Sequence, residues 1–199
     1  KLKAIGKSAF SGCTNLERFT IPEKVKVIHK CTFLGCQCLE NVDLPPELEE
    51  INGKAFSGCK SLTKIKLPKT IKKIGKGAFE KCSSLQVFII PGVLSIYPNG
   101  KQPKGINDET SIQNFKINAK CFNKCINIQN AIITSKCHLI DQFSFSSCPK
   151  LETITYSLSP ESKVGIYSFS DCSLLTEITT PLIESIGSYS FKGASFTTL

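Results

Sequence analysis

One short pattern recurs along the chain and limits the folds that are possible. Looser copies of it begin at Ile117, Ile140, Val164 and Ile186. Four closer copies stand 23 residues apart: IGKSAFSGCTNLERFTIP from Ile5, IHKCTFLGCQCLENVDLP from Ile28, INGKAFSGCKSLTKIKLP from Ile51 and IGKGAFEKCSSLQVFIIP from Ile74. A unit this short cannot bury its own apolar side, so the pattern predicts a continuous stack of about eight units.

Each unit contains a strand signal followed by turn signals. In LTKIKLP, Ile65 and Leu67 are two residues apart, as one buried face of a strand requires, and Pro68 ends the strand. Gly and small residues around a single Phe in IGKGAF predict a tight turn or a short 3₁₀ segment. Between these parts, Ile71 and Ile74 are predicted to point inward. We therefore expect one short strand per unit.

The aromatic position of the repeat is always Phe. Offset packing between neighbouring units predicts a spine of stacked rings under the convex side. Its members are Phe10, Phe33, Phe56, Phe79, Phe122, Phe145, Phe169 and Phe191.

Most of the eleven cysteines belong to the repeat as well. Equivalent Cβ atoms in successive layers lie about 4.8 Å apart, wider than the roughly 3.8 Å that a disulfide prefers. A ladder of buried thiols acting as small apolar groups is the simpler interpretation. Ala194 takes the place of the cysteine in the last copy, which supports this interpretation. The cysteines that stand three residues after the repeat Phe form one column: Cys13, Cys36, Cys59, Cys82, Cys125, Cys148 and Cys172. Four cysteines lie outside this column: Cys31, Cys38, Cys121 and Cys137.

The repeat is interrupted between Phe79 and Phe122. The surplus lies in residues 92–115, which are rich in Pro, Gly and polar residues. We expect a protruding insertion, because loops this long are usually functional or disordered. The alternative is a decayed repeat, since Ile112, Phe115 and Ile117 imitate the strand spacing. Whether the insertion shapes a binding surface or is a tolerated excursion stays open.

The motif IGxxAFxxCxxLxxIxIP resembles that of the BspA-like leucine-rich repeat proteins, over nearly the whole chain. This resemblance implies a right-handed solenoid of α/β (β-rich) class, with a concave parallel sheet and short turns or 3₁₀ segments on the convex side. It also implies adhesion or protein binding at a cell surface or after secretion. The asparagine common in leucine-rich repeats is replaced by Lys24, Glu47 or Thr70, so no asparagine ladder is expected.

The repeat spans residues 1–199, which we interpret as one domain and as a piece of a longer protein. No segment has the roughly 18 uninterrupted apolar residues of a membrane span, and no signal peptide opens the chain. The oligomeric state stays open.

Residues able to perform catalysis or bind metal are sparse. His29, Cys31, Cys36 and Cys38 could ligate zinc, but Cys36 belongs to the buried column and no C-x-x-C pair exists. A nucleophilic Cys121 or Cys137 would have only His138 as a partner, with no third group to orient it. We therefore expect a noncatalytic protein without cofactor or metal.

Positive charge is concentrated in one part of the sequence. The net charge is +9, and residues 51–90 contain nine lysines against Glu80 alone. These lysines form either a solvated face or an attraction site for a sulfated glycan, an acidic protein or a lipid head group. Nucleic acid is not expected, because exposed aromatics and arginines are missing there. The lysines are Lys54, Lys60, Lys64, Lys66, Lys69, Lys72, Lys73, Lys76 and Lys81.

The outward strand positions are predicted to form the binding face. Consecutive layers place Asp43 beside Lys66, while Val87 and Ile89 expose aliphatic groups where other copies are polar. These two residues mark a partner site, unless the insertion covers them. The candidate binding residues are Arg18, Asn41, Asp43, Lys64, Lys66, Val87, Ile89, Asn130, Ile132, Thr153, Thr155 and Glu177.

The sequence therefore favours a binding module that recognises a protein or an anionic glycan through the concave face. The competing interpretations are a structural spacer in a larger surface protein and, less favoured, an enzyme with its site near the insertion.

Overall fold

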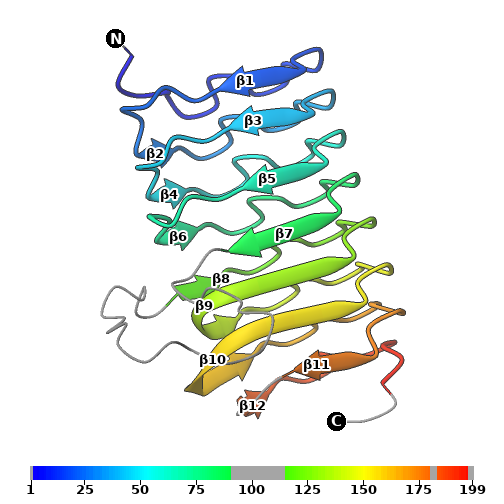
Figure 1. The fold of residues 1–199 in the computed structure, drawn as a ribbon. Coiled ribbons are helices and arrows are strands. Elements are labelled where there is room, and N and C mark those ends of the chain that lie inside the picture. Colours follow the sequence, from blue (N-terminus) through cyan, green and yellow to red (C-terminus); the bar gives the residue numbers. More distant parts are fainter. Residues whose placement is uncertain (1, 91–114, 180–182, 197–199) are drawn as a thin grey trace, which may run out of the picture.

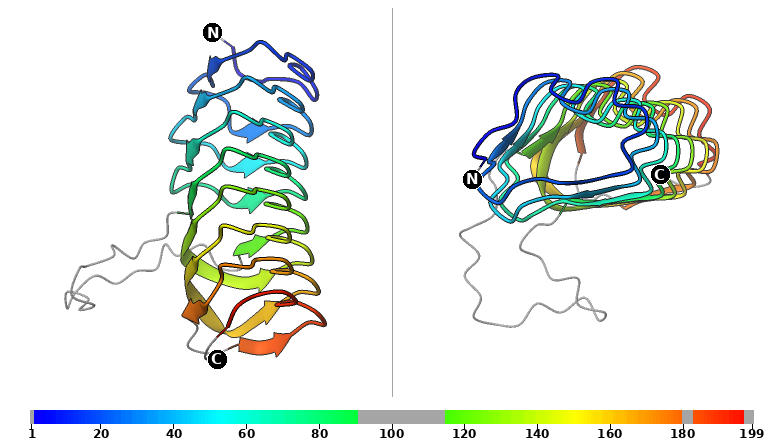
Figure 2. Two further views of the ribbon diagram at one scale, coloured as in Figure 1. Left: turned by 90° about the vertical axis from the view of Figure 1, so that its right-hand side faces the viewer. Right: turned by 90° about the horizontal axis from the view of Figure 1, so that it is seen from above.

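The computed structural model describes residues 2–90, 115–179 and 183–196, and in these ranges the chain winds as a solenoid. Figure 1 shows the coils piled along one axis, and Figure 2 shows from above that they superimpose as a closed, flattened loop. Parallel strands form two walls of this coil. The predicted solenoid is confirmed.

The first wall, called here the principal sheet, contains the predicted strands. It comprises β1 (Arg18–Thr20), β3 (Asn41–Asp43), β5 (Lys64–Lys66), β7 (Val87–Ile90), the first parts of β9 (Asn130–Ile140) and β10 (Thr153–Val164), and β11 (Glu177–Thr179). β1 pairs with β3, and β5 pairs with β7, which continues through β9 and β10 to β11. No strand pairing joins β3 to β5, although every residue of both strands is described.

A second sheet was not predicted. It comprises β2 (Val27–Ile28), β4 (Glu50–Ile51), β6 (Lys73–Ile74), β8 (Phe115–Ile117), the later parts of β9 and β10, and β12 (Ile183–Ile186). The proline after each early strand explains it. The carbonyls of Pro22, Pro45 and Pro68 accept hydrogen bonds from amides three residues later, at 2.9, 3.2 and 3.3 Å. Each turn aligns the following residues with the preceding coil, where they pair as a second strand.

β9 and β10 run through the corner between the two sheets. Thr134 and Ser157 stand in these strands where the earlier coils have the turn proline. Without that proline the backbone stays extended through the corner, although the pairing of β9 with β10 shifts register between Tyr156 and Leu158 and again between Leu158 and Lys163. The two walls therefore join as one continuous sheet in this part of the molecule.

The described residues contain strands and turns but no helix, so the segments around the repeat Phe are turns, one of the two forms predicted for them. Every coil places two residues in the left-handed region, for example Lys54 at φ 56° and Gly58 at φ 75°. Left-handed residues interrupt a right-handed helix, so the segment folds into successive turns.

The predicted phenylalanine spine is confirmed. Neighbouring rings are stacked, with centroids 5.3 Å apart for Phe33 and Phe56 and 5.4 Å apart for Phe56 and Phe79. The six inner rings are fully buried, while Phe10 and Phe191 are half-buried because each has a spine neighbour on one side only. The spine therefore extends through the described coils as one core.

The cysteine column is buried from Cys36 onward, and all eleven cysteines are free thiols. Each buried thiol also donates a hydrogen bond to the phenylalanine carbonyl of the preceding coil. The Sγ to oxygen distances are 3.2 Å for Cys59 to Phe33 and 3.1 Å for Cys82 to Phe56. The interpretation of these cysteines as small apolar groups was therefore incomplete. Cys13, in the first coil, is exposed.

The predicted insertion lies almost wholly outside the described residues, so its interpretation stays a prediction. On either side of it, β6 pairs with β8 and β7 pairs with β9.

Candidate binding surface

The outer face of the principal sheet carries two rows of side chains. Strand register places Arg18 beside Asn41 and Lys64 beside Val87 in one row. In the other row, Thr20 lies beside Asp43 and Lys66 beside Ile89, which in turn neighbours Ile132. The outward positions predicted from the alternation therefore share one wall of the molecule.

A groove of about 650 Å³ lies across β3, β5 and β7. It coincides with the place where β3 and β5 are not paired. Thr63 and Gln86 also line it, and these two were missed because they precede the strands and fall outside the alternating pattern. The predicted residues that it brings together are Asn41, Asp43, Lys64, Lys66, Val87 and Ile89.

The groove combines charged and aliphatic groups. Val87 is 37% exposed and Ile89 is 44% exposed, whereas Phe88 between them is fully buried. Because side chains alternate between the two faces of a strand, the burial of Phe88 fixes the outward direction of its neighbours. An exposed aliphatic pair beside charged groups is typical of a surface that contacts a partner.

Polar contacts order part of this face. The Thr20 hydroxyl donates to Asp43 Oδ2 at 3.1 Å, and the Thr153 hydroxyl donates to Asn130 Oδ1 at 2.6 Å. In the described part of the chain, Asp43 makes no ion pair with Lys66. The charges of Asp43 and Lys66 therefore do not neutralise each other in an ion pair.

The remaining candidate residues lie farther along the sheet and do not line the groove. Arg18, Thr153 and Glu177 are exposed, while Asn130 and Ile132 are half-buried. The side chain of Thr155 lies outside the described residues. The structure thus gathers about half of the predicted set at one place.

The lysines of residues 51–90 do not share one face. Lys64 and Lys66 lie on β5, whereas Lys73 belongs to β6 of the second sheet. A segment that winds around the coil distributes its side chains over several sides. The predicted lysine face is therefore divided between two walls and the turns that connect them.

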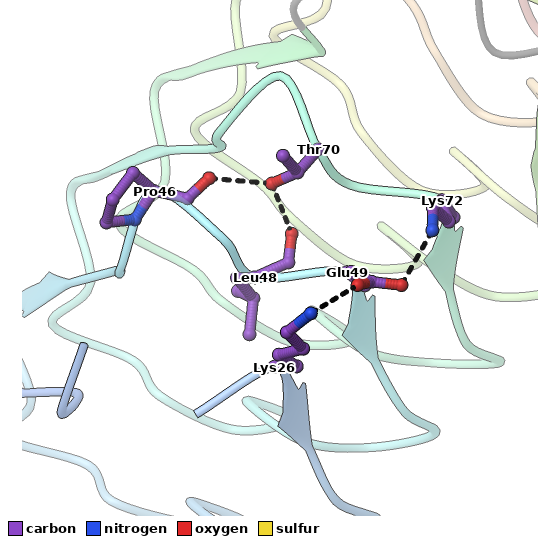
Figure 3. Close-up of polar contacts among 6 residues, drawn as sticks. All are labelled: Lys26, Pro46, Leu48, Glu49, Thr70 and Lys72. Atoms are coloured by element: carbon purple, nitrogen blue, oxygen red, sulfur yellow. Dashed lines mark hydrogen bonds and ion pairs between the residues drawn. The ribbon is translucent and has the colours of Figure 1, made fainter. Parts of the chain in front are cut away.

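Glu49 neutralises part of this charge on the second sheet. Its carboxylate lies 2.7 Å from Lys72 Nζ and 3.4 Å from Lys26 Nζ, which links three successive coils (Figure 3). Hydrogen bonds from Lys72 and Lys26 lower the pKa of Glu49 below its ordinary value. Beside it, Thr70 Oγ1 lies 2.7 Å from the carbonyl oxygens of both Pro46 and Leu48. Thr70 thus provides a hydrogen-bond donor to main-chain carbonyls at a position where asparagine is common in leucine-rich repeats.

The geometry gives no support to the weighed catalytic and metal sites. Within the described ranges, no three His, Cys, Asp or Glu side chains are placed to hold a metal ion. Cys36 instead donates to the Phe10 carbonyl at 3.0 Å. Burial raises the pKa of Cys137 to about 11, the opposite of what activates a thiol nucleophile. Burial also raises the pKa of Cys121.

Comparison with known proteins agrees with the repeat pattern and the coil. The family model of the BspA type leucine rich repeat region matches residues 3–100 and 106–199. The chain belongs to this family. A comparison with curated protein sequences returned no match.

Solved structures of leucine-rich repeat proteins share the fold. A T. pallidum leucine-rich repeat protein superimposes with a TM-score of 0.66 at 24% identity, covering 87% of this chain and 72% of that one. A leucine-rich repeat protein from Eubacterium ventriosum gives a TM-score of 0.74 at 22% identity, covering 92% of this chain and 44% of that one.

No helix in the described part of this chain is long and apolar enough to cross a bilayer.

Proposed function

We propose that this BspA-type repeat region is a noncatalytic binding module that recognises a protein through the groove across β3, β5 and β7. The observation that carries the proposal is the pair of exposed aliphatic residues, Val87 and Ile89, in a groove that also holds Asp43 and two lysines. Aliphatic anchors supply apolar area to a partner, while the flanking charges select its orientation.

Family resemblance supports display at a cell surface or secretion, with adhesion as the role. Proteins of the extracellular matrix are therefore the partners to test first. A purified chain screened against an array of such proteins should retain at least one of them at physiological ionic strength. Retention of none would contradict recognition of matrix proteins.

A double variant locates the binding surface. Changing Val87 and Ile89 together to Ser should weaken the retained interaction roughly tenfold or more, because both anchors leave the groove. The control changes Ile126 and Leu174 to Ser, since these are 46% and 49% exposed and lie outside the groove. Equal affinity of the groove variant and the parent chain, measured by surface plasmon resonance, would reject the groove.

A further inference from the structure

A second hollow, which shares no residue with the groove, lies where the turns follow the second sheet. It has a volume of about 660 Å³ and is called here the lysine hollow. Its charged lining residues are Lys30, Lys54, Lys73, Lys76, Lys120 and Glu80. Five lysines and a single glutamate therefore border one space.

Most of this positive charge is available to a ligand. Lys73 lies 3.4 Å from Glu50 and is partly neutralised. Across the described ranges, Lys30, Lys54, Lys76 and Lys120 form no ion pair with an acidic side chain. All four are exposed. A concave surface with uncompensated charge of one sign concentrates counter-ions of the opposite sign.

The backbone fixes the lysines in successive coils. The amide of Lys54 donates to the Lys76 carbonyl at 3.0 Å, and the amide of Gly77 donates to the Ala119 carbonyl at 3.0 Å. Because neighbouring parallel strands lie about 4.8 Å apart, the row from Lys30 to Lys120 extends roughly 14 Å along the solenoid axis. Such a row matches a linear ligand with charges at intervals better than it matches one compact anion.

Glycines bring the lysine-bearing coils close together. A Cβ on Gly75 would lie 2.5 Å from the amide nitrogen of Gly53, and Gly77 occupies a left-handed position at φ 63°. Lys54 and Lys120 take the same left-handed conformation at φ 56° and 57°. The missing side chains of the glycines therefore let the backbones of successive coils pack closely, so the lysines of neighbouring coils border the same hollow.

Aromatic faces for stacking bases are absent from the hollow. Lys120 Nζ lies 5.8 Å from the centre of the Phe143 ring. That ring stacks on Tyr167 at 5.2 Å, and Tyr167 stacks on Tyr189 at 5.0 Å, so the faces between them are occupied. No arginine lines the hollow. Single-stranded nucleic acid needs open aromatic faces, whereas sulfate groups need only positively charged donors.

From these observations we propose that the lysine hollow binds a linear sulfated polysaccharide, with one or more ammonium groups contributed by each of four successive coils.

The test uses a heparin hexasaccharide as the probe, titrated calorimetrically into the purified chain at two salt concentrations. Changing Lys54, Lys76 and Lys120 together to Gln should weaken binding at least tenfold. It should also reduce the slope of log affinity against log salt by about 2, since three cations no longer displace counter-ions. The matched control changes Lys60, Lys69 and Lys150 to Gln, which removes the same net charge from exposed positions outside the hollow.

Equal losses in the two triple variants would overturn the proposal, because they would show diffuse attraction to net charge. A single-stranded oligonucleotide of matched charge that binds as tightly as the hexasaccharide would also overturn it. Lysine acetylation of the parent chain gives a second measurement that does not depend on the folding of variants. The hexasaccharide should protect Lys54, Lys76 and Lys120 more than Lys60, Lys69 and Lys150, and equal protection would contradict the site.

Discussion

The repeat cysteines combine a small buried volume with a hydrogen-bond donor. Their thiols donate to phenylalanine carbonyls of the preceding coil, for example Cys125 to Phe79 at 3.1 Å. An alanine would fit the same space but would leave the second lone pair of that carbonyl without a donor. The sequence predicted the burial of this column because the spacing is regular. It did not predict the donor role, because the nearest carbonyl belongs to another coil.

Buried thiols make stability sensitive to alkaline pH. Burial raises the pKa of Cys36 from 9.0 to about 11 and the pKa of Cys125 from 9.0 to about 12. A raised folded-state pKa means that the folded chain holds the proton more tightly than the unfolded chain does. The stabilising contribution is therefore complete below about pH 9 and is lost as pH rises toward 11 to 12.

We expect the free energy of unfolding to fall over this range, with a slope of up to about 1.4 kcal/mol per pH unit for each buried thiol. Changing Cys125 to Ala should make the slope measured by urea denaturation less steep. Changing Thr14, an exposed residue with no titratable group, to Ala should leave the slope unchanged. Parallel slopes for the Cys125 variant and the parent chain would contradict this account.

At the scale of single elements, the short strands are determined as much by their turns as by their own residues. Val27 and Ile28 form a two-residue strand, too short to show an alternating pattern. Its pairing depends on the turn at Pro22 and on β4 of the next coil. The sequence analysis treated that proline only as the end of a strand, so it missed the second sheet. In Val87–Ile89, three residues alternate between the outer face and the core, and the predicted outward direction of Val87 and Ile89 was correct.

Glycines that follow the first Ile of a repeat unit differ in how closely the neighbouring coil approaches them. Gly75 and Gly6 occupy the same position of the repeat. A Cβ on Gly75 would meet the Gly53 backbone at 2.5 Å, whereas a Cβ on Gly6 would have no atom within 4 Å. Changing Gly75 to Ala should therefore destabilise the chain by about 1 to 3 kcal/mol through overpacking.

Changing Gly6 to Ala provides the matched control and should alter stability by less than about 0.5 kcal/mol. Both values come from urea denaturation of the purified variants. A Gly75 variant as stable as the Gly6 variant would mean that the backbones can separate without cost.

On the scale of the whole molecule, each coil is stabilised by its neighbours, so stability should rise from the first coil toward the middle. The Phe10 amide donates to Thr32 and the Phe56 amide donates to Ala78, both at 2.8 Å. Because these two hydrogen bonds have the same length but lie in different coils, the stability of the two coils can be compared directly through their amides. In a stacked array, opening an inner coil disrupts two interfaces, whereas opening the first coil disrupts one.

Native-state hydrogen exchange measures this difference. We expect the Phe56 amide to be protected at least about a hundredfold more than the Phe10 amide, which corresponds to about 3 kcal/mol. Equal protection would indicate that the described coils open together as one cooperative unit.

Features that arise between distant coils were beyond sequence reasoning. Lys30 and Lys120 belong to the same hollow although 90 positions and the predicted insertion separate them. The break between β3 and β5 was equally hidden, since LENVDLP and LTKIKLP both fit the strand pattern. What the repeat does predict is what every unit shares: the inward phenylalanine, the cysteine column and the alternating strand.

The break has a mechanical consequence. On the opposite wall β2 remains bonded to β4, and in the turns the Phe33 amide remains bonded to Ala55. On the flanks of the break, the Ser61 amide donates to the Gln37 carbonyl and Thr70 Oγ1 lies 2.7 Å from the carbonyl oxygens of Pro46 and Leu48, so the missing pairing is confined to β3 and β5 themselves. We therefore expect β3 and β5 to separate more readily than the paired neighbours of the principal sheet, because no ladder hydrogen bond has to break between Asp43 and Lys66.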